Sequence, residues 1–265
     1  MAPSDSGRQP HTGRPPDEVG AVLAALKREE PHFHASVEHP ANWQVSARVL
    51  DWLAATVRPG WQTLETGAGY STVLLIAGGA DHTAISPSPR EHVRIRDWCA
   101  AHGVDAGSAT FIACPSQEVL PTLEPTPLDL VLIDGDHSFP FPFLDWSYTA
   151  GRLRRGGLMV VDDTDIPTGA VLREFLANET GRWELERELG VATVFRKTCD
   201  DPFVHAAWQD QPWCATAYAA TRRRRERGQL GLRWLGLRVP GVRRVAPVLY
   251  RRLRAMRERT AGSGG

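Results

Sequence analysis

The stretch "LDLVLIDGDHSFPFPF" (128–143) begins as an apolar segment and ends in charge. Five of the six residues from Leu128 to Ile133 are apolar, and an aspartate, a glycine, a second aspartate and a histidine follow at once. The same change occurs in "GGLMVVDDTD" (156–165), where the apolar segment runs into Asp162 and Asp163. Short apolar segments bounded by glycine predict buried strands. Both predicted strands therefore end in carboxylates.

Strands and helices alternate on either side of this stretch. Strands are predicted at 61–66, 82–86, 109–113, 128–134 and 157–163, and helices at 70–79, 88–103, 116–123, 142–153 and 169–178. Two further strands, 183–189 and 191–197, are joined through Gly190 with no helix between them. Alternation of this kind predicts an α/β fold with a doubly wound, mostly parallel sheet. The last two strands should form an antiparallel hairpin at its edge.

The pattern divides the chain into five segments. We expect a disordered N-terminus at 1–17 (rich in Pro, Gly, Ser and Arg), a helical cap at 18–58, a core at 59–200, a connecting segment at 201–221 and a basic tail at 222–265. The cap should hold two helices, at 18–30 and 42–57, because apolar residues recur there at helical spacing.

Composition limits the classes of protein that the chain can represent. Of its 265 residues 42% are hydrophobic, which is enough for a real core, and no apolar run reaches the 18 residues of a membrane-spanning helix. The first residues contain no apolar stretch that could serve as a secretory signal. The four cysteines have no zinc-ligand or CxxC spacing, so we expect reduced thiols and a cytoplasmic protein.

The net charge of zero hides a strong asymmetry. Residues 222–265 contain 14 arginines and two glutamates, a net charge of +12, and the rest of the chain carries −12. Apolar residues recur at helical spacing between these arginines. Such a tail could dock on its own acidic body or on a partner subunit, or lie on an anionic membrane surface. Nucleic acid is the least favoured partner, because no recognition fold accompanies the charge.

A third feature lies at a strand end, in "TLETGAGYST" (63–72). Gly67 and Gly69 stand between the first core strand and its helix, where glycine permits a tight turn and close approach to a ligand. The third glycine of the dinucleotide fingerprint is missing, and the second strand ends in Ser86 instead of an acid. Both departures argue against a nicotinamide-dependent oxidoreductase.

Taken in order, the glycine loop, "FIACPSQEVLP" (111–121), "LDLVLIDGDH" (128–137) and "GGLMVVDD" (156–163) resemble a class I S-adenosylmethionine-dependent methyltransferase. The resemblance covers about residues 36–200. It is closest to the small-molecule O-methyltransferases of the catechol type and to a bacterial family in which "DGDH" follows the fourth strand. It implies a Rossmann-like fold and S-adenosyl-L-methionine as cofactor.

The resemblance also implies roles for single residues. The residues expected at the cofactor are Glu65 and Gly67 at its amino acid end, Gly69 and Ser71 in the loop and helix start, Ser116 and Gln117 at the adenine, and Asp134 near the methyl group. The family usually has an acid at the end of the second strand for the ribose hydroxyls. Here Ser86 occupies that position, and the contact could instead come from Ser88, Glu91 or water.

The acidic strand ends make chemical sense around a cation. In the metal-dependent branch of the family, carboxylates at the ends of the fourth and fifth strands hold one divalent ion, which would make Asp134, Asp162 and Asp163 its ligands. Carboxylate oxygens suit Mg²⁺ or Mn²⁺. Without a cation, the three carboxylates would repel one another and one would stay protonated. The simpler alternative is that Asp134 caps a turn with Gly135.

Two neighbouring residues could act as the general base. The imidazole group in general has a pKa near the working pH, which favours His137 on chemical grounds, and Asp136 lies two residues beyond the proposed ligand Asp134. The leading hypothesis is metal-assisted O-methylation of a small hydroxylated molecule. Two alternatives are metal-independent transfer with His137 as base, and a non-catalytic scaffold with a methyltransferase-like core. A homo-oligomer fits any of these, and the identity of the methyl acceptor stays open.

Overall fold

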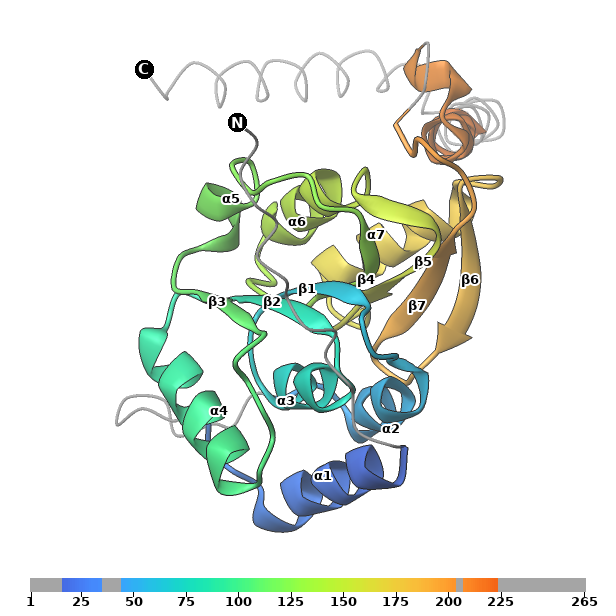
Figure 1. Cartoon of the computed structure of the whole chain (residues 1–265). Coiled ribbons are helices and arrows are strands. Elements are labelled where there is room, and N and C mark those ends of the chain that lie inside the picture. Colours follow the sequence, from blue (N-terminus) through green and yellow to red (C-terminus); the bar gives the residue numbers. More distant parts are fainter. Residues whose placement is uncertain (1–15, 35–43, 204–206, 224–265) are drawn as a thin grey trace, which may run out of the picture. The chain divides into compact units, whose positions relative to one another are not determined.

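The computed structural model describes residues 16–34, 44–203 and 207–223. The chain divides into two compact units, residues 1–204 and 205–265. The first unit consists of a seven-stranded sheet with a layer of helices on each face (Figure 1). In the described ranges, no helix is both long enough and apolar enough to cross a membrane.

The sheet has the strand order β3-β2-β1-β4-β5-β7-β6. Five strands run parallel and the last two are antiparallel to their neighbours, which confirms the predicted fold class. Their bounds are β1 Gln62–Thr66, β2 Asp81–Ile85, β3 Thr110–Ile112, β4 Leu128–Ile133, β5 Leu153–Val161, β6 Trp183–Glu188 and β7 Thr193–Lys197.

The helices lie in two layers on opposite faces of the sheet (Figure 1). One layer holds α1 Pro16–Glu29, α2 Ala47–Thr56, α3 Tyr70–Ala77 and α4 Pro89–Ala101. The other holds α5 Ser116–Val119, α6 Phe141–Thr149 and α7 Pro167–Asn178. Right-handed crossovers between parallel strands place helices on both faces when the chain winds outward in two directions from the middle of the sheet.

The strand order reverses between β1 and β4. From β1 the chain moves to β2 and β3 on one side, and from β4 it moves to β5 on the other. Ligands bind at such a reversal in open α/β sheets, outside the carboxyl ends of the strands. The Gly67 loop follows β1 and Asp134 follows β4, so the sequence features that suggested chemistry lie at this point.

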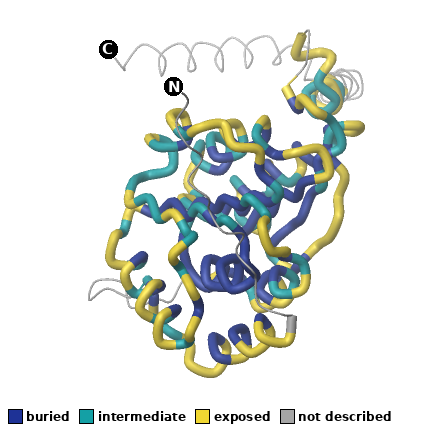
Figure 2. The backbone as a smooth tube through the Cα atoms, viewed as in Figure 1, coloured by how far each residue is buried: buried dark blue, intermediate teal, exposed yellow. Residues whose placement is uncertain are grey.

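The core explains why β4 reads as a continuous apolar run. Five of its six residues are buried, because helices cover both faces of a central parallel strand. All eight residues of α3 are buried as well (Figure 2). They lie between the sheet and α1, whose apolar stripe includes Val19, Val22 and Leu26. The cap helices therefore belong to the same core as the sheet.

Several element boundaries differ from the sequence predictions. α2 begins at Ala47 instead of 42, where Ser46 caps it, and three other differences also have a local reason. β5 begins at Leu153 instead of 157. A bulge near Gly156, which has φ +84°, lets the strand continue on both sides of Gly156 and Gly157. The same early start ends α6 at Thr149. α5 ends at Val119, because Pro121 disfavours helical backbone at the residue before it.

The second unit is described only in part. It contains a 3₁₀ turn, Trp208–Asp210, and helical residues at 212–223. The prediction for the basic tail falls almost entirely outside the described residues, and so does most of the predicted disordered segment 1–17.

Candidate cofactor and active site

The carboxyl ends of four strands are joined by backbone hydrogen bonds that continue beyond the strands themselves. The Gly67 amide donates to Ile85 at 2.8 Å, the Asp134 amide to Thr66 at 3.0 Å, and the Asp162 amide to Ile133 at 3.0 Å. These bonds tie the end of β1 to β2, β4 to β1, and β5 to β4. The structure thus brings together the glycine loop and both acidic strand ends along one edge.

Gly67 is required by this close approach. Its φ is +97°, a conformation that costs little only for glycine, and a Cβ atom there would lie 2.3 Å from the carbonyl oxygen of Asp134. The loop between β1 and α3 can therefore fold tightly against the end of β4. The backbone amides at the start of α3 follow directly, and unpaired amides at a helix N-terminus favour anionic groups.

Glu65 lies beneath this loop, with 1% of its surface exposed. Its carboxylate accepts hydrogen bonds from the Thr72 hydroxyl and, at 3.1 Å, from His82 Nε2. The Thr72 hydroxyl also accepts the Gly69 amide at 2.8 Å. Glu65 therefore holds the loop from below through Thr72. Ser71, in the first turn of α3, is also buried.

The sequence analysis missed the two residues that complete this network. Thr72 follows Ser71 in the quoted loop. Its position three residues after Gly69, from which a side chain can accept the amide of the residue before the helix, is the signal that could have identified it. His82 lies on β2, and its Nδ1 atom is 2.9 Å from the Thr63 hydroxyl on β1. Nothing in the sequence around His82 indicates this contact. It depends on the register of β1 and β2, which places His82 opposite Thr63.

Ser86, at the end of β2, does not stand alone. Its hydroxyl donates to Glu91 Oε2 at 2.5 Å, and His34 Nδ1 lies 3.3 Å from Glu91 Oε1. Burial raises the pKa of Glu91, but the bonds from His34 and Ser86 outweigh it, so the net pKa lies below its ordinary value. An ionised carboxylate from α4 thus lies where the strand itself offers only a hydroxyl.

His34 extends this cluster to the glycine loop. A Cβ atom on Gly69 would lie 3.2 Å from His34 Nε2, so the segment that follows α1 reaches the loop directly. Phe33, the residue before His34, packs edge-on against Tyr70 with ring centroids 5.5 Å apart. The end of the helical cap is therefore in contact with the glycine loop and the start of α3.

The acidic strand ends form a crowded group around one histidine. His137 Nε2 lies 3.2 Å from Asp163 Oδ2 and 3.7 Å from Asp134 Oδ1. Burial, and then the charges of Asp162, Glu65 and Asp163, raise the pKa of Asp134 well above its ordinary value. Burial also raises the pKa of Asp162, whose Oδ1 atom is buried and makes no hydrogen bond to any residue the structure describes. The group therefore carries the electrostatic strain that the sequence predicted.

Asp163 adds backbone strain to this group. Its φ is +49°, a left-handed conformation that non-glycine residues seldom adopt. Gly169 accommodates it, because a Cβ atom at Gly169 would lie 2.2 Å from the Asp163 carbonyl oxygen. Strained residues of this kind concentrate at functional sites.

The two candidate bases are held differently. Asp136 Oδ1 accepts the Ser138 amide at 2.8 Å and the Ser138 hydroxyl at 2.6 Å, so this oxygen closes a turn. His137 instead directs Nε2 at the acidic group, and the Thr168 hydroxyl fixes its backbone carbonyl at 2.5 Å. Ser116 and Gln117 lie in the first turn of α5, both partly exposed.

No three His, Cys, Asp or Glu side chains in the described ranges are arranged to hold a metal ion. The ligands predicted for the cation, Asp134, Asp162 and Asp163, are nevertheless adjacent at the ends of two paired strands. Asp134 Oδ1 and Asp163 Oδ2 both lie within 3.7 Å of His137 Nε2, and the coordination of a metal stays a prediction.

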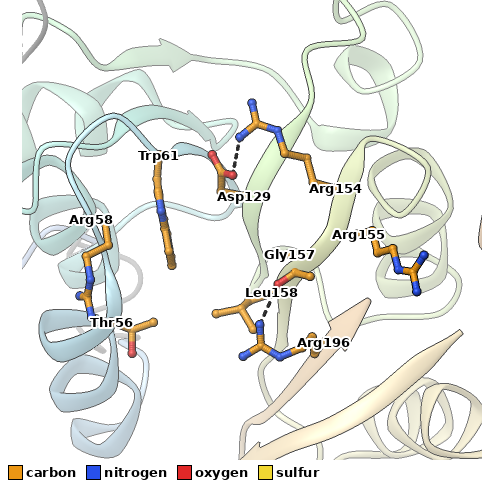
Figure 3. Close-up of a pocket in the computed structure, with 10 residues that line it drawn as sticks. Thr56, Arg58, Trp61, Asp129, Arg154, Arg155, Gly157, Leu158 and Arg196 are labelled. Atoms are coloured by element: carbon orange, nitrogen blue, oxygen red, sulfur yellow. Dashed lines mark hydrogen bonds and ion pairs between the residues drawn. The ribbon is translucent and has the colours of Figure 1, made fainter. Parts of the chain in front are cut away.

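A separate hollow of about 370 Å³ lies at the opposite edge of the sheet (Figure 3). It is formed at the amino ends of β1, β4 and β5 and contains none of the predicted site residues. Arg154 pairs there with Asp129 at 2.5 Å, and Arg196 donates to the Gly156 carbonyl at 2.8 Å. The arginines that line it are largely bound by groups of the protein itself.

Comparison with known proteins agrees with the geometry of the carboxyl edge. Residues 64–164 match a family described as a methyltransferase domain. A catechol O-methyltransferase from Mycobacterium tuberculosis is 32% identical over 169 residues, which cover 61% of this chain and 70% of that protein.

Solved structures show the same fold at lower identity. A protein from Klebsiella pneumoniae is 20% identical with a TM-score of 0.50 and covers 71% of this chain and 91% of its own. A protein from Corynebacterium glutamicum is 17% identical with a TM-score of 0.50 and covers 74% and 94%. With the fold, the strand-end residues and the sequence match in agreement, the chain belongs to the class I S-adenosylmethionine-dependent O-methyltransferases.

Proposed function

We propose that the protein transfers the methyl group of S-adenosylmethionine to a hydroxyl oxygen of a small molecule at the carboxyl edge of the sheet. The observation that carries this proposal is a set of backbone hydrogen bonds between neighbouring strand ends. These bonds hold the Gly67 loop, Asp134 and Asp162 side by side along one edge of the sheet. In the reaction, an oxygen lone pair forms the bond to the methyl carbon. The carbon–sulfur bond breaks toward sulfur, and a base takes the hydroxyl proton.

The residues at this edge fit the parts of the cofactor. Backbone amides of the Gly67–Gly69 loop and the start of α3 suit its carboxylate. Glu91 offers an ionised carboxylate to the ribose hydroxyls, and Ser116 and Gln117 lie on α5 for the adenine. Glu65 would act on the cofactor through the loop, because its own carboxylate binds Thr72 and His82.

Asp134, Asp162 and Asp163 fit a Mg²⁺ or Mn²⁺ ion by the chemistry of their oxygens. The buried, unpaired Asp162 Oδ1 and the raised pKa of Asp134 are the features that a bound cation would relieve. Because no three ligands are yet arranged around one point among the described residues, side chains would have to turn toward each other on binding. When bound, such a cation supplies positive charge that lowers the pKa of the acceptor hydroxyl.

His137 is the base that the geometry supports better. Its Nε2 atom faces Asp163 and Asp134, which would stabilise the imidazolium formed when it takes a proton. Asp136 is the rival, with one oxygen already bound within its turn. The 3.2 Å contact between His137 and Asp163 also favours a second candidate, transfer without a metal, in which neutral His137 takes the hydroxyl proton and Asp163 stabilises the imidazolium that forms.

The test separates these possibilities in two steps. Calorimetric titration with S-adenosylhomocysteine should show binding, and its absence at millimolar ligand would leave a scaffold role. Methyl transfer to catechol is then measured after EDTA treatment and after Mg²⁺ is restored. Metal-assisted transfer predicts loss and recovery of the rate, and loss in Asp162→Ala, whereas the exposed control Asp165→Asn should keep the wild-type rate.

The base is identified by the dependence of the rate on pH. If His137 is the base, His137→Ala should lower kcat by about 10²–10⁴-fold and remove the loss of rate at acid pH that protonation of the base causes. Asp136→Ala should then keep that loss of rate at acid pH. The opposite pattern would assign the base to Asp136.

The basic segment 222–265 is proposed to dock on an acidic surface, either of its own core or of a second subunit. Its net charge of +12 opposes the −12 of the rest of the chain. An anionic membrane surface is the alternative. Sedimentation of the purified chain with and without anionic vesicles, at low and high salt, distinguishes a homo-oligomer from membrane binding.

A further inference from the structure

One buried carboxyl group near the site has no role in the chemistry described above. Asp145, in the middle of α6, is 0% exposed. Within the described part of the chain, neither of its carboxyl oxygens has a partner in hydrogen-bonding geometry. A buried carboxyl without a good partner costs stability, so its presence calls for a functional explanation.

Asp145 lies where three cofactor-site segments meet. Its Oδ2 atom is 3.4 Å from the position that a Cβ on Gly135 would occupy, and the Thr66 hydroxyl is 3.2 Å from the same position. α6 also packs against the short helix α5, which begins at Ser116. Burial raises the pKa of Asp145, and the hydroxyls of Ser116 and Thr66 lower it by less. Asp145 therefore lies next to the end of β1 and the turn after β4, on a helix that contacts α5.

The neighbouring hydroxyl is also incompletely bonded. Thr66 Oγ1 is buried and, like the Asp145 oxygens, lacks a hydrogen-bond partner among the described residues. An acceptor and two hydroxyl donors thus lie together without well-formed bonds. Hydrogen bonds around a site are often long in the free protein and tighten in its complexes.

We propose that Asp145 is a positioning residue, which draws the Ser116 end of α5 toward the Gly135 turn and so shapes the adenosyl side of the cofactor site without touching the cofactor. This inference rests on the proposed function. It explains why a polar group is kept in a position where an apolar one would pack at lower cost. Gly135 has no side chain, and the space next to it is left to Asp145 and Thr66.

The decisive measurement compares stability with affinity in Asp145→Leu. Removing a poorly bonded buried carboxyl should leave the unfolding midpoint of the free protein unchanged or higher. The affinity for S-adenosylhomocysteine, measured by calorimetry, should fall by at least about tenfold, the effect of one lost hydrogen bond to a charged group. A residue that served only the packing of the core would lower both together.

Three further variants complete the experiment. Asp145→Asn keeps one acceptor oxygen and should recover most of the affinity. Ser116→Ala should weaken binding more in the wild type than in Asp145→Leu, because in the variant only the direct contact of Ser116 with the adenine is left to lose. Tyr148→Phe, at an exposed position of the same helix, is the control and should bind as the wild type does.

The outcomes are distinguishable. If the wild type binds S-adenosylhomocysteine and Asp145→Leu binds it equally well, the inference is wrong and the proposed function stands. If Ser116→Ala weakens binding equally in both backgrounds, Asp145 does not act through Ser116 and the inference is also wrong. If Asp145→Leu fails to fold, the affinity of Asp145→Asn is compared with that of the wild type, and the effect of Ser116→Ala is compared between these two proteins. The same outcomes then support or contradict the inference. Failure of the wild type to bind would overturn the proposed function itself.

Discussion

Among the single residues of the site, Glu91 shows how a missing group can be supplied from another element. Ser86 ends β2 without a charge, yet its hydroxyl and His34 together hold the Glu91 carboxylate at the same place. A carboxylate has about four acceptor positions, so two remain for further donors. A pair of adjacent ribose hydroxyls is a ligand that could use both.

We therefore expect Glu91→Ala to weaken binding of S-adenosylhomocysteine by about 10–100-fold, because hydrogen bonds to a charged group contribute about 1.5–3 kcal/mol. The specific measurement uses an analogue that lacks the two ribose hydroxyls. Removing the two hydroxyls from the ligand should lower the affinity of the wild type much more than it lowers the affinity of the Glu91→Ala variant. Asp97→Asn, exposed on the same helix, is the control. An equal loss in both proteins would show that Glu91 does not bind the ribose.

Asp134 illustrates the opposite case, in which a functional group lowers stability. Burial and the neighbouring carboxylates raise its pKa above the unfolded value of about 3.9. Above pH 4 the folded protein therefore binds more protons than the unfolded chain. Its stability falls as the pH rises toward the folded pKa.

Asp134→Asn should remove this penalty. In EDTA at pH 7 we expect the variant to be more stable than the wild type by on the order of 1 kcal/mol, a common size for one substitution, while losing activity. The difference should shrink as the pH is lowered toward 4. Urea unfolding at three pH values measures it, with Asp165→Asn as control. A difference that grows toward acid pH would contradict the argument.

At the level of elements, the C-terminal hairpin is part of the core sheet and not an appendage. β7 lies between β5 and the edge strand β6, and Phe195 on β7 pairs with Met159 on one side and Leu185 on the other. Phe195 is fully buried, whereas Leu185 is 46% exposed. Substituting each residue with alanine therefore compares how much β7 and β6 contribute to the stability of the core.

Phe195→Ala should lower the free energy of unfolding by about 3–5 kcal/mol, because a large buried ring leaves a cavity. Leu185→Ala should lower it by less than about 1 kcal/mol, since much of that side chain already contacts water. Chemical denaturation of both variants measures the difference. Similar losses in the two variants would contradict this difference between β7 and β6.

The elements themselves were predictable from the sequence, but the contacts between them only in part. Apolar runs and glycines predicted every strand and its order in the chain, because burial and turn chemistry are local. They also placed Gly67, Asp134 and Asp162 at strand ends, which the parallel sheet then brings together. The partners of Glu65 were not predictable, because His82 reaches it only through the register of β1 and β2.

Asp145 was missed for a related reason. In "FPFLDWSYT" (141–149) an aspartate among apolar residues reads as the polar side of an amphipathic helix. In the structure this position is buried against the β4 turn, where helix packing and not sequence period decides its environment. The pairing of Glu91 with Ser86 and His34 likewise joins three separate segments.

For the whole molecule, the sheet separates two edges with different properties. The carboxyl edge contains the crowded carboxylates, including the buried oxygens of Asp162 and Asp145 that lack hydrogen bonds within the described residues. At the amino edge, Arg154 pairs with Asp129 and Arg196 with the Gly156 carbonyl (Figure 3). The residues proposed to bind the cofactor therefore lie at one edge and these arginines at the other, both within residues 1–204.

This separation predicts what truncation should do. All residues proposed to bind the cofactor lie in the first compact unit, so a chain that ends at Val204 should bind S-adenosylhomocysteine with unchanged affinity and unfold cooperatively. It loses the arginine-rich segment, so its association with an acidic partner or with anionic vesicles should disappear, because that association depends on charge. Calorimetry and sedimentation of the two chains test both expectations. A truncated chain that folds but no longer binds the ligand would place part of residues 205–265 in the cofactor site.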